Sequence, residues 1–183
     1  MPQDFVYFDL ETQKSANDVG GWGHKDKMLM SVGVTYSTAE GRYRIFGEKQ
    51  VDDLIAQLQK ADMVIGYNHI SFDYEVLMGY TILDLKEQCR SLDLMIDLEA
   101  EVGHRPKLDA IAAASLGVGK TAEGIQAIKW WQEGKVMEIA EYCAFDVKVT
   151  KMVHEYGVEH GFVKYTNRFN QTQDIPVKWT APA

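Results

Sequence analysis

Four carboxylates and one phenol occur in three short segments of this chain, and these residue types suit the binding of hard divalent cations. The first segment holds Asp9 and Glu11, the second holds Asp73, and the third holds Tyr142 and Asp146. Carboxylate oxygens are ligands that Mg²⁺ and Mn²⁺ prefer, and a pair of such ions needs several of them. A phenolic hydroxyl nearby can orient a water by a hydrogen bond. The residue types therefore indicate a two-metal hydrolytic site.

The spacing within the segments supports this interpretation, although each segment alone has a more ordinary explanation. Asp9 and Glu11 are two apart on a predicted strand, so they share one face of the sheet. Tyr142 and Asp146 are four apart on a predicted helix, so they lie one turn apart on one face. Taken singly, the carboxylates could mark a strand end or the first turn of a helix, as for Asp73, and Tyr142 with Asp146 could be a surface pair.

Taken together and in this order, the three segments resemble the three motifs of the DEDDy branch of 3'–5' exonucleases. The resemblance covers residues 4 to about 160 and rests on the residue stretches 8–12, 68–73 and 142–146. Residues 91–94, 107–109 and 116–120 are similar to predicted exonucleases related to bacterial polymerase-B proofreading domains. Gly21, Trp22, Trp130, Trp131 and Gly134 are similar to small ribonuclease-H-like predicted exonucleases, and the choice between these two neighbours stays open.

The resemblance implies a role for each motif residue. Asp9 would bridge two ions, Mg²⁺ or Mn²⁺. Glu11 and Asp146 would complete the coordination of the first ion, and Asp73 would bind the second. Tyr142 would position the attacking water. The substrate-binding residues implied by the motifs are Leu10, Thr12, Asn68 and Phe72.

The implied activity is that of a 3'–5' exonuclease. It would hydrolyse the terminal phosphodiester bond of single-stranded DNA or RNA at a free 3' end and release 5'-mononucleotides. The motifs do not choose between DNA and RNA. No polymerase or helicase accompanies the segments in this sequence, so a protein partner is also considered.

The elements that position these residues follow from hydrophobic periodicity. Strands are predicted at residues 4–10, 28–36, 43–46, 63–66 and 91–96, and helices at residues 51–60, 73–80, 108–116, 121–132 and 136–156. This order predicts an α/β protein with a ribonuclease-H-like mixed sheet flanked by helices. The expected domain covers residues 1–165, with a short strand near 162–165. Residues 166–183 are expected to form a mostly irregular C-terminal tail.

Composition limits the possible partners of the protein. The chain has 183 residues and a net charge of −8, which argues against tight, non-specific binding of duplex nucleic acid. Bound divalent cations would reverse the local sign of an acidic cleft. The sequence has no apolar run long enough to span a membrane and no signal peptide is expected. Cys89 and Cys143 lack metal-ligand spacing, so free thiols and a cytoplasmic location are predicted.

Other interpretations remain open at this level. A catalytically silent nucleic-acid-binding module of the same fold is the main alternative. Residues 114–121 loosely match a phosphate-binding loop, but such a loop must follow a strand, and residues 108–116 are predicted to be helical.

Several further residues have both a structural and a functional interpretation. One of Trp130 and Trp131 could stack on bases, while core packing is expected for the other. Asp93 and Asp97 could join the acidic cluster, although strand-end or helix-start roles are favoured. The candidates for phosphate contacts, otherwise expected to be solvated, are Arg105, Lys107, Lys148 and Lys151.

Overall fold

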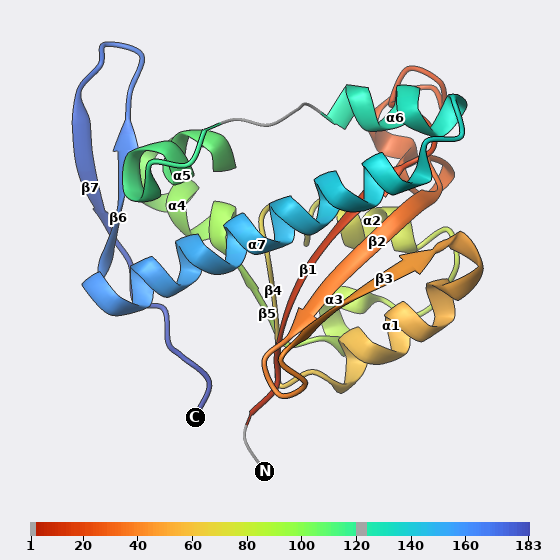
Figure 1. The fold of residues 1–183 in the computed structure, drawn as a ribbon, viewed down its shortest axis with the longest axis horizontal. Helices are drawn as coiled ribbons and strands as arrows, with labels where there is room; N and C mark the ends of the chain where they lie inside the picture. The colour runs from red at the N-terminus through yellow and green to blue at the C-terminus, as the bar shows by residue number, and fades with distance from the viewer. Residues whose placement is uncertain (1–2, 120–123) are drawn as a thin grey trace.

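The computed structural model describes residues 3–119 and 124–183, and a five-stranded mixed sheet forms its centre (Figure 1). The strands lie in the order β3-β2-β1-β4-β5. Strand β1 pairs antiparallel with β2, β2 pairs antiparallel with β3, and both β1–β4 and β4–β5 are parallel. The strand bounds are Phe5–Thr12 (β1), Met30–Ser37 (β2), Arg42–Gly47 (β3), Met63–Gly66 (β4) and Ser91–Asp93 (β5).

Helices cover both faces of this sheet. The longest helix, α7 (Val136–His160), crosses one face against β1 and β2, and α1 (Val51–Lys60) and α2 (Asp73–Leu77) pack on the other face (Figure 1). The other helices are α3 (Leu85–Gln88), α4 (Leu94–Val102), α5 (Leu108–Leu116) and α6 (Gly124–Gln132), with short 3₁₀ turns η1 (Trp22–Lys27) and η2 (Glu48–Gln50).

The alternation of residues along β1 divides the core into two parts. Phe5 and Tyr7 are buried in the cluster on the α7 face, whereas Val6 and Phe8 are buried in the cluster on the α1 face. Since strand side chains alternate between faces, the next odd-numbered residues continue on the α7 side. The sequence thus places two carboxylates, described below, under the longest helix rather than in solvent.

Helix α7 buries a stripe of small and apolar side chains against the sheet. The predicted stripe is confirmed, because Ile139, Ala140, Cys143, Val147 and Val153 are all buried. The helix continues past the predicted end at residue 156. It stops at Gly161, whose φ of 74° is the left-handed conformation that terminates helices and favours glycine.

The α/β class, the mixed sheet and most element positions agree with the sequence predictions. Helix α5 covers the same residues as predicted, and α6 begins at Gly124 among the described residues. The part of the predicted helix at residues 121–123 lies outside them. The predicted 73–80 helix is shorter, because α2 ends at Leu77.

The predicted strand at residues 91–96 is wrong beyond Asp93. The Asp93 side chain accepts a hydrogen bond from the Met95 backbone N–H at 3.1 Å. It therefore caps a helix, and α4 replaces the second half of the expected strand.

The C-terminal segment is more ordered than the sequence suggested. Strand β6 (Phe162–Thr166) pairs antiparallel with β7 (Thr172–Pro176) and forms a hairpin at the end of α7 (Figure 1). Ile175 and Trp179 belong to the main core cluster. The sequence did not reveal β7, because Thr172-Gln173-Asp174 carries no apolar alternation. No helix among residues 3–119 and 124–183 has the length and apolar character needed to cross a membrane.

Candidate active site

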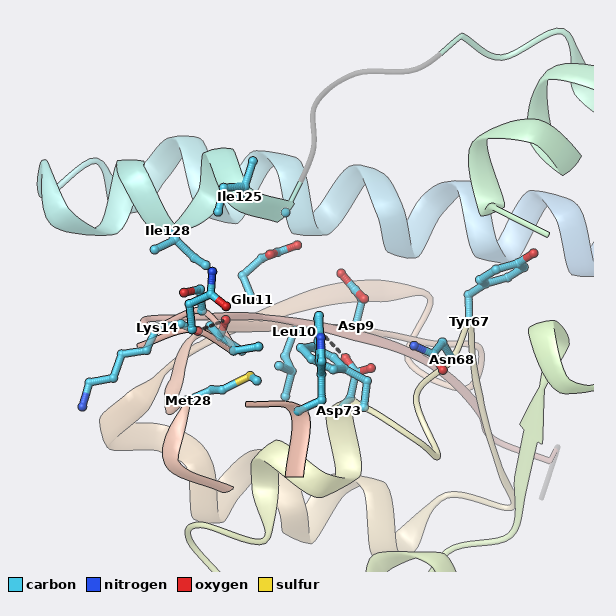
Figure 2. A pocket seen from close by; sticks show the side chains of 17 residues that line it. Asp9, Leu10, Glu11, Lys14, Met28, Tyr67, Asn68, Asp73, Ile125 and Ile128 are labelled. Atoms are coloured by element: carbon cyan, nitrogen blue, oxygen red, sulfur yellow. Dashed lines mark hydrogen bonds between the residues drawn. The ribbon is translucent and has the colours of Figure 1, made fainter. Parts of the chain in front are cut away.

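Three carboxylates from two elements meet under α7. Asp9 and Glu11 come from β1 and Asp146 comes from α7, and their ligand oxygens all lie within 4.8 Å of one another. The sequence motifs therefore converge in space although they are more than a hundred residues apart. In Figure 2 the carboxylates of Asp9 and Glu11 both point from the strand toward the helical layer.

Asp73 lies beside this cluster at the first residue of α2. Its Oδ1 accepts a hydrogen bond from the Leu10 backbone N–H at 3.0 Å, drawn as a dashed line in Figure 2. This bond fixes the fourth carboxylate to β1, between the two strand carboxylates in sequence. The Asp73 side chain is buried, so its orientation is set by the fold rather than by solvent.

Burial and mutual repulsion dominate the electrostatics of the cluster. Burial raises the pKa of Asp9 well above its usual range, and the nearby charges of Asp73, Glu11 and Asp146 raise it further. The pKa of Glu11 is raised for the same reasons, with burial again first. Burial also raises the pKa of both Asp73 and Asp146 to about 7, and Asp109 contributes to the Asp146 shift. Such a set of clustered, repelling oxygens fits a divalent cation, which relieves the repulsion.

Tyr142 and Cys143 flank the cluster from the same helix as Asp146. The pKa of the Tyr142 phenol is raised, first by burial and then by the surrounding carboxylates, so the hydroxyl remains a hydrogen-bond donor. Its ring packs edge-on against Trp130 with centroids 6.2 Å apart. The buried Cys143 thiol donates to Asp9 Oδ2 at 3.4 Å, a contact that its small size and position on α7 did not reveal in the sequence.

A mostly apolar cavity of about 470 Å³ opens beside the carboxylates. All four residues assigned to substrate binding, Leu10, Thr12, Asn68 and Phe72, line it, together with Asp9, Glu11 and Asp73. Ile125 and Ile128 of α6 form its upper wall in Figure 2. Trp22 of η1 closes another side, and its ring meets Phe72 at a centroid distance of 6.3 Å.

A second cavity of about 520 Å³, here called the basic groove, lies on the other side of the cluster. It is lined by Tyr142, Asp146 and Asp109, and by Arg105 and Lys107 from the loop between α4 and α5. Tyr67, Asn68 and Gly124 line both cavities. The two cavities therefore form one cleft that crosses the carboxylates, apolar on one side and partly cationic on the other.

Asn68 occupies the junction of the two cavities in a constrained conformation. Its φ of 67° is in the left-handed region, which asparagine tolerates better than most residues. Two hydrogen bonds to the buried Asp93 carboxylate hold the loop, donated by the backbone N–H of Asn68 at 2.8 Å and of Ile70 at 3.1 Å. Arg105 donates to Asn68 Oδ1 at 2.6 Å. The Asp93 carboxylate thus holds the backbone of the second motif in place through Asn68 and Ile70.

The structure also locates the other acidic and aromatic residues that the sequence had suggested for the site. Asp93 and Asp97 lie outside the carboxylate cluster, and Asp97 instead accepts a hydrogen bond from the Trp179 indole at 2.9 Å. Trp130 and Trp131 are both half-buried against the main core. His69 is fully buried and packs edge-on against Tyr74.

The remaining lysines and the loop-like segment do not extend the site. Lys148 is exposed, and Lys151 pairs with Glu155 at 2.7 Å, so only Arg105 and Lys107 of the four candidate cations line the cleft. Residues 108–116 form α5, so a helix precedes the phosphate-loop-like segment where such a loop needs a strand. Lys120 and Thr121 lie outside the described residues.

Several cleft residues were absent from the sequence-based assignment. They have ordinary local sequences and lie on η1, the loop after β4, α5 and α6: Trp22, Tyr67, Asp109, Ile125 and Ile128. Of these, Trp22 was noted in the sequence through its similarity to small ribonuclease-H-like predicted exonucleases, and in the structure its exposed fraction is 68%.

Comparisons with known proteins agree with the fold. A family model described as the RNase_H superfamily matches residues 6–158. The structure is similar to that of the family B DNA polymerase from the hyperthermophilic archaeon Pyrobaculum calidifontis, with a TM-score of 0.63 and 16% sequence identity. The match covers 86% of this chain and 25% of the polymerase, so the likeness concerns the fold of a part of that enzyme. No curated protein matches the sequence.

Proposed function

The chain belongs to the RNase_H superfamily, and from this premise we propose that it is a metal-dependent 3'–5' exonuclease of the DEDDy type. The observation that carries the proposal is the convergence of Asp9, Glu11 and Asp146 within 4.8 Å, beside a cavity of about 470 Å³. Such a carboxylate cluster beside a cavity large enough for a nucleoside is the arrangement that hydrolysis of a terminal phosphodiester bond requires.

The residues of the cluster would hold two divalent cations, Mg²⁺ or Mn²⁺. Asp9, Glu11 and Asp146 would bind one ion, and Asp73 with Asp9 would bind the second. When bound, such ions activate a water and stabilise the charge on the leaving oxygen. The hydrogen bond from Leu10 to Asp73 keeps the fourth carboxylate aligned with β1 while substrate exchanges.

The protein side chains would then orient the reacting groups. Tyr142 keeps its proton and donates a hydrogen bond that positions the attacking water. The apolar cavity accommodates the terminal nucleoside, with Leu10 and Phe72 against its base and Thr12 and Asn68 near its polar groups. The water oxygen bonds to phosphorus, and the bond from phosphorus to the 3' oxygen of the preceding nucleotide breaks. The products are a 5'-mononucleotide and a strand with a new 3'-hydroxyl.

The proposal includes a single-stranded substrate, DNA or RNA, and a cytoplasmic location. The apolar cavity of about 470 Å³, lined by residues of η1 and α6, has the size expected for one terminal nucleoside, which supports a free strand end as the substrate. Cys89 and Cys143 are both buried free thiols, as expected in a reducing compartment. A protein partner that delivers the substrate is compatible with the net charge of −8.

A gel time course on 5'-labelled single-stranded DNA and RNA tests the proposal. The wild type should shorten the strand from its 3' end with Mn²⁺ or Mg²⁺ and not with EDTA. Asp9→Asn should abolish the reaction, whereas Asp52→Asn, an exposed carboxylate on α1, should not. Binding of both strands without cleavage under every metal condition would contradict the proposal and support the catalytically silent module.

A further inference from the structure

The β6–β7 hairpin carries an aromatic and a cationic side chain at its exposed tip. Phe169 has 68% of its surface exposed, and the Arg168 guanidinium lies 4.8 Å from its ring centroid. The Asn167 side chain accepts hydrogen bonds from the backbone N–H groups of Phe169 at 2.9 Å and Gln171 at 3.1 Å. The tip is therefore an organised turn that presents an exposed ring beside a guanidinium, although nothing in the core requires either one there.

A cavity of about 340 Å³ lies below this tip. It is lined by His104, Tyr165, Asn167, Arg168 and Phe169. The His104 Nε2 and the Tyr165 hydroxyl are hydrogen-bonded at 3.0 Å, so the hairpin is tied to the loop between α4 and α5. On the other side of the hairpin, Ser115 of α5 exchanges hydrogen bonds with the Lys164 backbone, which fixes β6 to that helix.

The loop between α4 and α5 connects this cavity to the cleft. His104 lines the hairpin cavity, and its neighbour Arg105, one Cα spacing of about 3.8 Å away, lines the basic groove. Lys107 of the same loop also faces the groove. Consecutive residues of one loop therefore line the two cavities, with the carboxylates on the Arg105 side and Phe169 on the His104 side.

We propose that the β6–β7 hairpin is a nucleic-acid-binding arm, which holds a single strand on the 5' side of the bond that is cleaved. The inference rests on the proposed function for its direction. The terminal nucleoside carries no phosphate beyond the scissile one, so it suits the apolar cavity. The remaining strand carries a phosphate at every step, so it suits the side with Arg105, Lys107 and Arg168.

The chemistry of the tip matches a single strand of either sugar. Exposed aromatic rings stack on bases without sequence preference, and arginine binds phosphates and base planes. The carboxylate of Asp174 is paired with Lys164 at 2.7 Å, whereas Glu99, 3.6 Å from Arg105, offsets part of the charge of that arginine. Arg105, Lys107 and Arg168 are thus the cations available to phosphates on this side, where Asp109 and Asp146 also line the groove.

The arm is also separate from the part of the chain that the family shares. The family model matches residues 6–158, and the hairpin begins at Phe162. Val163 and Ile175 anchor the hairpin in the core, whereas Arg168 and Phe169 are exposed. Core packing explains the buried residues at the base of the hairpin, but it does not explain the exposed Arg168 and Phe169 at the tip.

Fluorescence anisotropy with a labelled single strand of about 12 nucleotides tests the arm. The binding measurements use Asp9→Asn as the parent protein, so that cleavage does not interfere. Phe169→Ala and Arg168→Gln are each compared with that parent. The matched controls are Ile82→Ala, an exposed apolar residue away from the cleft, and Lys178→Gln, an exposed cation beyond β7.

The arm predicts that Phe169→Ala weakens binding at least about fivefold, the equivalent of one lost base stack. Arg168→Gln should lower the slope of log affinity against log salt by about 0.7, and Arg168→Lys should recover that slope. In the cleaving protein, the ratio of variant to wild-type kcat/KM should fall as the strand is lengthened from a dinucleotide.

The proposal would be overturned if Phe169→Ala and Arg168→Gln bound the strand as tightly as the two controls. The exposed tip would then be assigned to a contact with another protein. These results are independent of whether the protein cleaves. A wild type without nuclease activity refutes the proposed function, while the anisotropy still decides whether the hairpin binds a strand.

Discussion

At the scale of single residues, the carboxylate cluster couples stability to pH. Asp73 and Asp146 have folded-state pKa values of about 7, above the value of about 4 for an exposed aspartate in the unfolded chain. The folded state therefore binds more protons between about pH 4 and pH 7. The free energy of unfolding then falls as the pH rises through this window, because the folded state must accept buried charge.

We predict that the metal-free wild type loses stability relative to Asp73→Asn between about pH 5 and pH 8, by on the order of 1–4 kcal/mol. Urea unfolding of both proteins at the two pH values measures this difference. Mn²⁺ added at the higher pH should restore stability to the wild type, since it binds only the folded cluster. Parallel pH profiles for the two proteins would show that Asp73 does not titrate in this way.

The proposed role of the Tyr142 phenol can be tested independently of the proposed metal ligands. Tyr142→Phe should lower kcat roughly 5- to 150-fold, the loss expected for one hydrogen bond of 1–3 kcal/mol in the transition state. Mn²⁺ affinity, measured by calorimetry, should stay near the wild-type value because no ligand is removed. An equal kcat for variant and wild type would exclude Tyr142 from positioning the water.

At the scale of elements, β1 and α7 show what the sequence can reveal. Both have a clear periodicity, and their polar residues occupy defined places in it: Asp9 and Glu11 continue the odd face of the strand, and Asp146 lies one turn after Tyr142. The geometry of the carboxylates was therefore predictable from spacing. The sequence did not predict α4 or β7, because neither has such a periodicity. Helix α4 follows a capping aspartate, and β7 is mostly polar.

The walls of the cleft were beyond sequence reasoning for a different reason. Trp22, Arg105 and Ile128 belong to the 3₁₀ turn η1, the loop between α4 and α5, and the helix α6, and their positions depend on how these segments fold over the sheet. Tertiary packing determines such positions, and no local pattern records it. The cation candidates illustrate this, since only the structure distinguishes Arg105 from Lys151.

The loop that carries Asn68 depends on one buried carboxylate. Asp93→Ala would leave the backbone N–H groups of Asn68, Ile70 and Met95 without their acceptor. We predict a loss of about 1–3 kcal/mol in unfolding free energy and a higher KM for short substrates. Asp84→Ala is the control, because Asp84 caps α3 through a single exposed bond to Lys86. Equal losses in the two variants would contradict a positioning role for Asp93.

At the scale of the whole molecule, the C-terminal segment completes the core. The Trp179 ring stacks on His154 with centroids 5.8 Å apart and lies so close to Gly157 that an added Cβ would be 2.4 Å from it. The segment after α7 thus contributes side chains to the hydrophobic core of the domain.

Two tryptophans give a matched test of this division between core and cleft. Trp179→Ala should cost about 3–5 kcal/mol, the usual effect of removing a buried aromatic side chain. Trp22→Ala should change unfolding free energy little, because the side chain is largely exposed, and should raise KM. Chemical denaturation and steady-state kinetics on both variants measure these effects. A stable Trp179→Ala protein would contradict the packing described here.

The length of α7 has a consequence for the products of the reaction. From Asp146 to His160 the helix runs about 21 Å at 1.5 Å per residue, and the hairpin follows directly after Gly161. This length of helix lies between Asp146 and the base of the hairpin, so under the proposed function a strand must span it to contact both the cleft and the arm. A strand that still reaches the arm is trimmed step after step, while a shorter remnant has only the cleft to hold it. Digestion by the wild type should therefore slow at a fixed remnant length, and this dependence of the rate on strand length should weaken in Phe169→Ala.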